Sequence, residues 1–405
     1  MTGTKMPVIV LDISRTVSRL SNANPTGIDR VELAYINHFL TYTGRVVFLA
    51  RFRKQSVFLD RNGMQTFLNM MSGEAAWGDL DFIGRLSRNK KAAHVESNLR
   101  RLALSWPSLK TGMTKVGVSD GVYLNVGHGK LMPKLWDKLK GFSGKKICMV
   151  HDVIPLDFPE YCSEKTRLRF KVEFSAMAAN SNYLIWNSQH TSDRANVWLR
   201  DLNVDPPLSA VVPLGVDIPN AREHNPTNPP YFVAIGTIEP RKNHALLLDI
   251  WEDLYDEYGN DAPKLHIVGG RGWMNDAVFH RLDSAPYMET VVVEHGYLPE
   301  QELSDLLANA SGLLFPSVAE GFGFPLIDAI ARNVPVVCSD IPAFKEFGKN
   351  YPIYADPHDK QSWVDAIDRL STGGGQTEFK KRAKPEINTW EKHFSQLSSI
   401  LSDLS

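Results

Sequence analysis

The sequence has few cysteines and no paired cysteine motif. Only Cys148, Cys162 and Cys338 occur in 405 residues, and no two of them stand in a Cys-x-x-Cys spacing. An odd number of widely separated cysteines excludes a disulfide framework and argues against a structural zinc site. We therefore expect all three to be core thiols in a reducing compartment.

Long apolar runs and an excess of charge of either sign are also missing. The first apolar run, residues 8–11, ends at Asp12, and no run in the chain is long enough for a signal-peptide core or a bilayer span. The formal net charge of −1 argues against a general nucleic-acid binder, which needs a basic surface to neutralise phosphates. We expect a cytoplasmic protein with no nucleic-acid partner.

What is present divides the chain into two α/β halves. Residues 1–218 begin with a strand, a helix and a strand, and contain an irregular, partly helical insertion at about 60–115. Residues 219–230, with four prolines and three asparagines, have the composition of a linker. Residues 231–385 alternate apolar runs with helical stretches, and the tail, 386–405, is a helix expected to return to the first domain. This order predicts two Rossmann-like, doubly wound domains facing a cleft.

The expected strands are short, continuous apolar runs, as in parallel sheets buried on both faces. They lie at 8–11, 46–50, 122–125, 147–150, 184–186 and 210–213 in the first half, and at 231–235, 265–268, 291–293, 313–315 and 334–338 in the second.

An acidic, glycine-rich segment from Glu320 to Asp328 is the strongest candidate for a ligand site. Gly321 and Gly323 would let backbone amides approach a ligand closely. Pro325 suits the first turn of a helix, whose N-terminus attracts anions. Glu320 is expected in a loop facing the cleft and Asp328 on the first helical turn, so that both carboxylates can hold hydroxyl groups of a sugar or a ribose. On pattern alone, a glycine-rich turn before an acidic helix start explains the segment equally well.

Three smaller groups of residues point to the same cleft. Arg241 and Lys242 follow Gly236 directly after an expected strand, and two adjacent cations there suit a diphosphate. His151 follows the expected strand at 147–150, and Gly27 with Arg30, at the start of the first helix, offers a second anion contact. Taken singly, a solvated basic turn and a hydrogen-bonded loop histidine are the more frequent explanations.

In this order, the segments resemble glycosyltransferase family 4, a group of retaining transferases with the GT-B fold. Residues 315–323, Phe-Pro-Ser-Val-Ala-Glu-Gly-Phe-Gly, resemble the family hallmark, in which a second glutamate follows Glu320 after seven residues. Residues 236–242 resemble its Gly-x-x-x-x-Arg-Lys motif. The chain departs from the family at the second acidic position, which is Asp328. The resemblance is strong over about 205–400 and thin before 120.

The resemblance implies that His151, Arg241, Lys242 and Glu320 are catalytic. The two cations would neutralise the donor diphosphate, Glu320 would contact the donor sugar or its leaving phosphate, and His151 would bond the sugar near its anomeric carbon. Asp328 would bind the ribose. The implied donor-binding set is Gly27, Gly236, Arg241, Lys242, Glu320, Gly321, Phe322, Gly323 and Asp328. No metal, other cofactor or covalent nucleophile is implied.

Residues 151–156, His-Asp-Val-Ile-Pro-Leu, resemble family members that use GDP-mannose in surface-polysaccharide assembly. We therefore predict mannose transfer from GDP-mannose, with UDP-sugars as the next choice, onto a glycan or lipid-linked acceptor. A same-fold nucleotide-sugar epimerase and a non-catalytic nucleotide-sugar-binding scaffold stay open. A dinucleotide oxidoreductase is disfavoured because no Gly-x-Gly-x-x-Gly is present, and Asp79-Leu80-Asp81 is the one candidate for a metal-dependent transferase motif.

A basic segment suggests contact with an anionic membrane, at the inner face of the cytoplasmic membrane. Its only acid is Glu96, and its cations are Arg85, Arg88, Lys90, Lys91, Arg100 and Arg101. On a helix, an apolar face formed by Val95, Leu99, Leu102 and Trp106 would lie opposite Arg100 and Arg101. Packing of that face on its own domain is an equally good interpretation.

Overall fold

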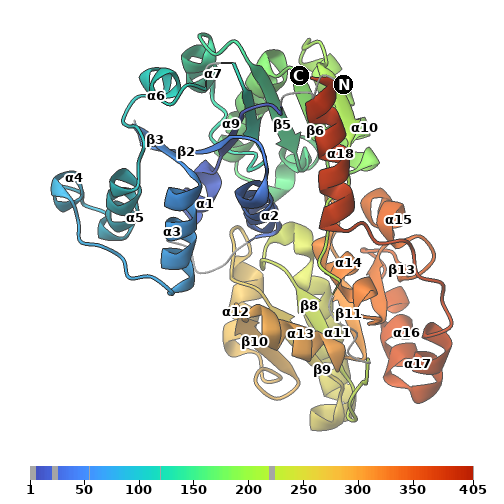
Figure 1. Cartoon of the computed structure of the whole chain (residues 1–405). Helices are drawn as coiled ribbons and strands as arrows, with labels where there is room; N and C mark the ends of the chain where they lie inside the picture. Colours follow the sequence, from blue (N-terminus) through green and yellow to red (C-terminus); the bar gives the residue numbers. More distant parts are fainter. Residues whose placement is uncertain (1–5, 21–25, 54, 119, 219–223, 405) are drawn as a thin grey trace.

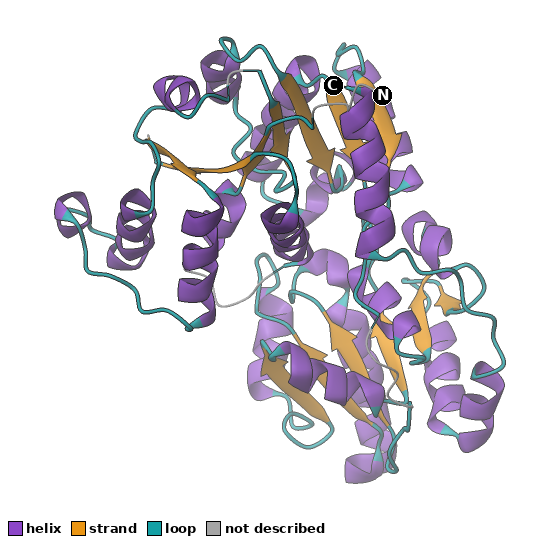
Figure 2. Ribbon diagram, viewed as in Figure 1, coloured by secondary structure: helices purple, strands orange, loops and turns teal. Residues whose placement is uncertain are grey.

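The computed structural model describes residues 6–20, 26–53, 55–118, 120–218 and 224–404. Two β-sheets lie one above the other, each with helices on both of its faces (Figures 1 and 2). The strand order is β3-β2-β1-β4-β5-β6-β7 in the first sheet and β10-β9-β8-β11-β12-β13 in the second. Only the β2–β3 pair is antiparallel among the described strands. The predicted pair of doubly wound α/β domains is confirmed.

The strands of the first sheet are β1 Ile9–Asp12, β2 Val46–Phe52, β3 Gln55–Leu59, β4 Val122–Asn125, β5 Lys145–Val150, β6 Tyr183–Trp186 and β7 Leu208–Val211. Those of the second are β8 Tyr231–Ile235, β9 Lys264–Val268, β10 Val292–Gly296, β11 Gly312–Phe315, β12 Val336–Ser339 and β13 Ile353–Ala355.

The helices of the first half are α1 Ser14–Arg19, α2 Gly27–Thr41, α3 Arg61–Ser72, α4 Phe82–Arg85, α5 Lys90–Arg101, α6 Leu109–Lys115, α7 Pro133–Leu139, α8 Ile154–Asp157, η1 Pro159–Tyr161, α9 Glu164–Asn180 and α10 Gln189–Asp201. Those of the second are η2 Pro240–Lys242, α11 His244–Tyr258, η3 Gly259–Asp261, α12 Asp276–Ser284, α13 Glu300–Ala308, α14 Phe324–Ala331, α15 Pro342–Gly348, α16 Lys360–Ser371, α17 Gly373–Phe379 and α18 Trp390–Asp403.

Each expected strand overlaps an observed one, and two observed strands were not expected. β3 pairs with β2 across a short turn, from Phe48 opposite Leu59 to Phe52 opposite Gln55. It lies at the edge of the sheet beside the insertion, and its residues form no long apolar run. β13 has three residues, too few for a recognisable pattern. Apolar runs therefore predict the buried centre of each sheet better than its edges.

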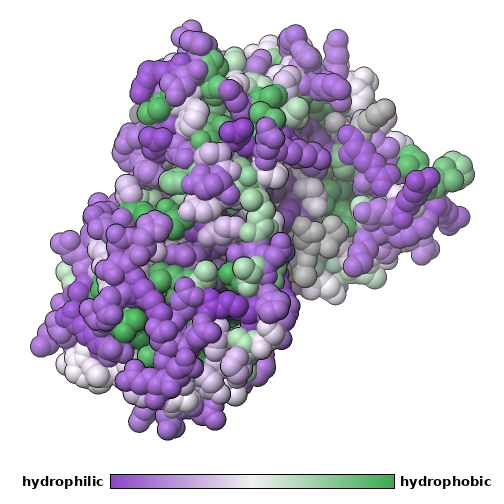
Figure 3. Space-filling view, turned by 180° about the vertical axis from the view of Figure 1, so that it is seen from behind, coloured by the Kyte–Doolittle hydropathy of each residue, from purple (hydrophilic) through white to green (hydrophobic). Residues whose placement is uncertain are grey.

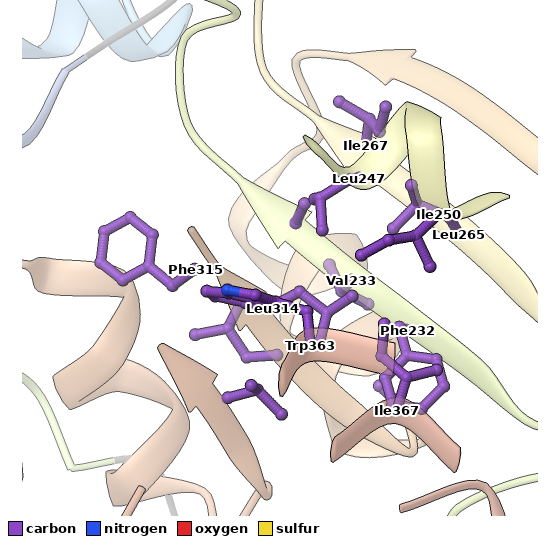
Figure 4. Close-up of a cluster of buried hydrophobic side chains, with 14 of the residues drawn as sticks. Phe232, Val233, Leu247, Ile250, Leu265, Ile267, Leu314, Phe315, Trp363 and Ile367 are labelled. Atoms are coloured by element: carbon purple, nitrogen blue, oxygen red, sulfur yellow. The ribbon is translucent and has the colours of Figure 1, made fainter. Parts of the chain in front are cut away.

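The core of the second domain packs both faces of its sheet. On one face, Phe232 of β8, Leu265 and Ile267 of β9 and Leu314 of β11 lie beneath Leu247 and Ile250 of α11 and Trp363 and Ile367 of α16, whereas Val233 of β8 points to the other face (Figure 4). All of these side chains are at most 1% exposed. A fully buried aliphatic or aromatic side chain contributes roughly 1.5–3 kcal/mol, so this cluster holds the strand ends that carry the cleft loops.

The C-terminal helix α18 packs on the first domain, as predicted (Figure 1). Phe394 stacks on His38 of α2 with ring centroids 3.9 Å apart. The buried ring of His393 bonds the Tyr35 hydroxyl at 2.7 Å and the Pro213 carbonyl at 2.8 Å. The first domain is thus completed by residues from the end of the chain.

The two domains also meet behind the cleft. The carboxylate of Glu346, on α15, accepts the backbone N–H groups of Gln189 and His190 at 2.7 and 2.9 Å, at the start of α10. The Gly321 carbonyl accepts the Ser188 hydroxyl at 2.8 Å. These contacts fix the approach of the domains near the candidate site.

Part of the predicted linker belongs to the second domain. Residues 219–223 lie outside the described residues. The buried His224 ring bonds the Ala310 carbonyl at 2.7 Å, and the backbone N–H groups of Asn225 and Thr227 donate to the carbonyls of Ala308 and Asn309. Composition indicated a linker, but it carries no information about these long-range bonds.

Two further expectations are corrected. Cys148 and Cys338 are buried free thiols, but Cys162 is only partly buried, on the surface near η1. Arg100 does not face solvent, because its guanidinium forms a two-bond ion pair with Asp81, at 2.6 and 2.8 Å. Leu99, on the predicted membrane face of α5, is fully buried within the first domain.

Candidate active site

The candidate site lies where the strand order reverses in both sheets. In the second sheet β8 and β11 are neighbours, and the loops that follow them carry residues 236–242 and 316–323. In the first sheet the same reversal lies between β1 and β4, and His151 follows β5. Loops at such switch points diverge and leave a crevice at the carboxyl ends of the strands. The resulting cleft has a volume of about 1360 Å³ and is lined by both domains.

Arg241, Lys242 and Glu320 form the charged centre of this cleft. The Lys242 ammonium pairs with Oε1 of Glu320, and Nη1 of Arg241 lies 2.9 Å from the same oxygen. Burial alone would raise the pKa of Glu320, but the two cations outweigh burial and lower it to about 2. The carboxylate is therefore ionised throughout the neutral range. The two cations thus lie at the carboxyl ends of the strands, next to the N-terminus of α14, where Glu320 and Glu239 balance their charges.

Arg241 is held by contacts on two edges of its guanidinium. Its Nε is 2.7 Å from Oε1 of Glu239, and its Nη1 donates to the Ala319 carbonyl at 2.9 Å. The Val318 N–H donates to the Arg241 carbonyl at 2.8 Å, which joins the two site loops. A guanidinium anchored in this way presents its remaining N–H groups in a fixed direction.

His151 lies on the opposite wall, buried at 4% exposure. Its Nε2 is 2.7 Å from the Val126 carbonyl, and burial, with a contribution from nearby His128, lowers the pKa of His151 to about 3. The ring is therefore neutral at pH 7. Because a carbonyl only accepts, Nε2 carries the proton and Nδ1 is left as an acceptor. His151 can accept a hydrogen bond from a sugar hydroxyl, but it is not a proton donor at neutral pH.

Asp328 and Arg30 meet across the cleft. Asp328 lies on the second turn of α14 rather than on the first, because the helix begins at Phe324. Its Oδ2 accepts Nη1 of Arg30 at 2.7 Å, so the Arg30 guanidinium, expected as an anion contact, pairs with a protein carboxylate. Nothing in the local sequence signals a pair separated by almost 300 residues.

The predicted glycines line the cleft for identifiable steric reasons. A Cβ on Gly321 would lie 2.0 Å from the His151 carbonyl oxygen, and one on Gly27 would lie 2.9 Å from the Phe324 ring. Gly236 has a φ of +149° and lies against the Lys242 stem, and Gly323 has a φ of +90°. Gly27 and Gly321 therefore allow the domains to touch, while Gly236 and Gly323 adopt positive φ angles that residues with a side chain rarely adopt. Phe322 is buried against Phe324 and Phe347, with ring centroids 5.1 and 4.6 Å away.

Two carboxylates in the cleft were not predicted as site residues. Glu239 is 2% exposed, and its Oε2 has no hydrogen-bond partner among the described residues. Asp152 follows His151 and caps the Ile154 N–H at 3.1 Å. Burial raises the pKa of both groups, and Arg241 opposes the rise. Their positions inside the motifs at 236–242 and 151–156 were the available signal.

The Asp79-Leu80-Asp81 triplet is structural. Asp81 caps α4 by accepting the Gly84 N–H at 2.7 Å and pairs with Arg100. In the part of the chain that the structure describes, no three His, Cys, Asp or Glu side chains gather as metal ligands.

The fold and the position of the site define a two-domain protein of the GT-B class. Sucrose-phosphate synthase from Thermosynechococcus elongatus superposes on the chain with a TM-score of 0.62 at 14% identity, covering 98% of this chain and 99% of that one. The complex of Anabaena Alr3699/HepE with UDP and glucose gives a TM-score of 0.58 at 16% identity, covering 98% and 99%.

The family of the second half follows from its sequence. Residues 217–389 match the family described as Glycosyl transferases group 1. The serotype-specific mannosyltransferase WbdA of Escherichia coli is 32% identical over 235 residues, which cover 54% of this chain and 29% of WbdA. The O-antigen chain mannosyltransferase RfbU of Salmonella typhimurium is 30% identical over 228 residues, covering 55% and 59%. The matches thus span less than two thirds of these relatives.

Proposed function

We propose that the chain is a retaining hexosyltransferase of glycosyltransferase family 4 that moves mannose from GDP-mannose onto a glycan or lipid-linked acceptor in polysaccharide biosynthesis. The observation that carries the proposal is the convergence of Arg241 and Lys242 on Glu320 at the switch point of the domain that matches Glycosyl transferases group 1. The mannosyltransferase relatives support the choice of sugar.

The charges of the site suit the departure of a nucleoside diphosphate. When the glycosidic bond to the phosphate breaks, negative charge grows on the leaving oxygen, and preorganised cations stabilise it most at that moment. Neutral His151 can accept a sugar hydroxyl on the other side of the bond. We assign no covalent nucleophile, and we propose that the departing phosphate assists attack from the same face. In this mechanism side-chain cations and helix N–H groups, rather than a metal ion, stabilise the negative charge of the departing diphosphate.

Three measurements on the purified protein test the function. GDP should raise the unfolding temperature more than UDP does, with a stabilisation of about 2.7 kcal/mol at a hundredfold excess over Kd. GDP-mannose should be hydrolysed slowly without acceptor and transferred with unchanged anomeric configuration when acceptor glycan is added. Both activities should persist in excess chelator.

Each contrary outcome identifies a different alternative. Stabilisation by UDP but not GDP would indicate a UDP-sugar as the donor in place of GDP-mannose. Loss of activity in chelator that magnesium reverses would contradict metal independence. Conversion of the donor sugar into its epimer without transfer would indicate an epimerase. Nucleotide binding without turnover of any donor would indicate a scaffold.

We also propose that the protein contacts an anionic membrane at its cytoplasmic face, through four of the predicted cations and through two apolar residues that were not predicted. Phe82 and Leu86 are 77% and 74% exposed at the tip of the arm formed by α4 and α5. The neighbouring exposed cations are Arg85, Arg88, Lys90 and Lys91. Hydrophobic atoms amid hydrophilic ones mark the tip of this arm, on the right of Figure 3. Exposed apolar groups ringed by cations suit insertion between anionic headgroups. Among the described residues, no helix has the length and apolarity to cross a bilayer.

Liposome co-sedimentation tests the membrane contact. Binding should require anionic lipid, and F82S combined with L86S should reduce the bound fraction severalfold. L208S is the matched control, because Leu208 is 67% exposed on β7, outside the arm. Equal binding to neutral vesicles, or unchanged binding by the double variant, would contradict the proposal.

A further inference from the structure

We propose that Arg30 is a positioning residue for the nucleotide ribose, holding one carboxylate oxygen of Asp328 so that the other accepts the ribose hydroxyl groups. The inference rests on the proposed function, because it takes the ligand to be a nucleoside-diphosphate sugar.

Arg30 and Asp328 belong to different domains. Arg30 lies on α2 and Asp328 on α14, with Nη1 and Oδ2 2.7 Å apart. The guanidinium lies over the Phe324 ring, 4.8 Å from its centroid, and its Nη2 is 3.9 Å from a carboxylate oxygen of Asp217. Contacts on both sides therefore hold the Arg30 guanidinium in position.

The second oxygen of Asp328 is available for a ligand. Oδ1 is buried and accepts no hydrogen bond from the described residues. Its neighbour Arg332 has Nη1 3.8 Å away, outside hydrogen-bonding distance. Asp328 lines the cleft on the same wall as Glu320. A buried carboxylate oxygen that lacks a donor costs free energy, and a ribose with two neighbouring hydroxyl groups supplies donors.

The pairing with Arg30 explains aspartate at this position. Gly27 lets α2 approach Phe324 of α14 so closely that a Cβ there would lie 2.9 Å from the ring. A glutamate carboxylate would reach about 1–1.5 Å farther, into the space that Arg30 occupies. The shorter side chain fits the narrow space between the two helices and leaves Oδ1 without a hydrogen bond from the described residues.

A direct contact between Arg30 and the diphosphate is the competing role. Arg30 already has a hydrogen-bonded carboxylate, Asp328, with Asp217 nearby. A phosphate would have to displace the 2.7 Å bond to Asp328, whereas a ribose at Oδ1 leaves it intact. The geometry therefore favours an action through Asp328.

The experiment compares GDP with 2′,3′-dideoxy-GDP, which lacks both hydroxyl groups, in calorimetric binding to the full chain. The wild type should bind GDP about 10-fold more tightly, as expected for hydrogen bonds to a charged group. R30Q should reduce this preference to about twofold while leaving the affinity for the dideoxy nucleotide nearly unchanged. R30K should restore part of the preference. R169Q is the matched control, since Arg169 pairs with Glu173 on α9, and thermal unfolding verifies each fold.

The outcomes separate the inference from the proposed function. If UDP binds in place of GDP, the same ratio is measured with UDP and 2′,3′-dideoxy-UDP, so a wrong donor leaves the test intact. An undiminished preference in R30Q would overturn the inference, as would equal losses for both nucleotides, which indicate a phosphate contact. D328E should bind GDP more weakly than the wild type, and tighter binding would refute the spacing argument.

Discussion

K242A is expected to lower the turnover of sugar transfer by roughly 100- to 1000-fold, the range found when a preorganised group that stabilises transition-state charge is removed. Lys242 is partly buried beside Glu320 and lines the cleft where the diphosphate is expected. Its charge is needed most when the phosphate departs, so kcat should fall more than donor affinity does.

The fold should survive this substitution, because Arg241 remains 2.9 Å from Glu320. Steady-state kinetics and a thermal melt measure the two effects. K360A is the control, since Lys360 pairs with Asp253 outside the cleft. R241A is a less specific test, because it would leave Glu239 and Glu320 short of a cationic partner and lower stability as well. Near wild-type turnover in K242A would contradict the placement of the donor diphosphate beside Lys242.

G321A is expected to reduce transfer by about 100-fold, the cost of misplacing reacting groups by about 1 Å. The new Cβ would lie 2.0 Å from the His151 carbonyl oxygen and 3.0 Å from Cβ of Asp152. Because the neighbours are largely backbone atoms of the other domain, only a shift of the whole cleft wall relieves the clash. The bond from Ser188 to the Gly321 carbonyl, 2.8 Å long, would be strained by that shift.

Activity should fall without loss of secondary structure, since the clash lies between domains rather than within a core. G374A provides the control, because a Cβ at Gly374 in α17 meets no atom within 4 Å. Transfer rate, circular dichroism and the unfolding temperature are compared for the two variants. Full activity in G321A would mean that the domains react at a wider separation than in this structure.

The central strands were predictable because their signal is local. Parallel strands buried on both faces read as continuous apolar runs, and each expected run overlaps a strand. β3 was not predicted because Gln55–Leu59 is a short edge strand beside the insertion. β13 was not predicted because three residues are too few to show a repeating pattern of apolar residues. Likewise, the roles inferred for Arg241, Lys242 and Glu320 came from motifs at the ends of strands, where α/β sheets bind ligands.

The arm formed by α4 and α5 shows what local sequence patterns do not predict, namely which side chains are exposed. Helical spacing correctly places Val95 and Leu99 on one face of α5, but it does not say what covers the other faces. In the fold Arg100 forms an ion pair with Asp81 within the first domain. Phe82 and Leu86, which no sequence pattern singled out, are exposed. Exposure depends on neighbours that are distant in sequence.

By itself, the sequence determined the two α/β domains, the strands at their centres and the charged residues at the strand ends, because each of these depends on neighbouring residues and their spacing. Only the tertiary structure decided that Arg30 pairs with Asp328, that Gly321 lies against His151, and that Glu346 caps α10. Each of these contacts joins the two domains. Their approach is set by packing over the whole interface, which no local pattern of residues encodes.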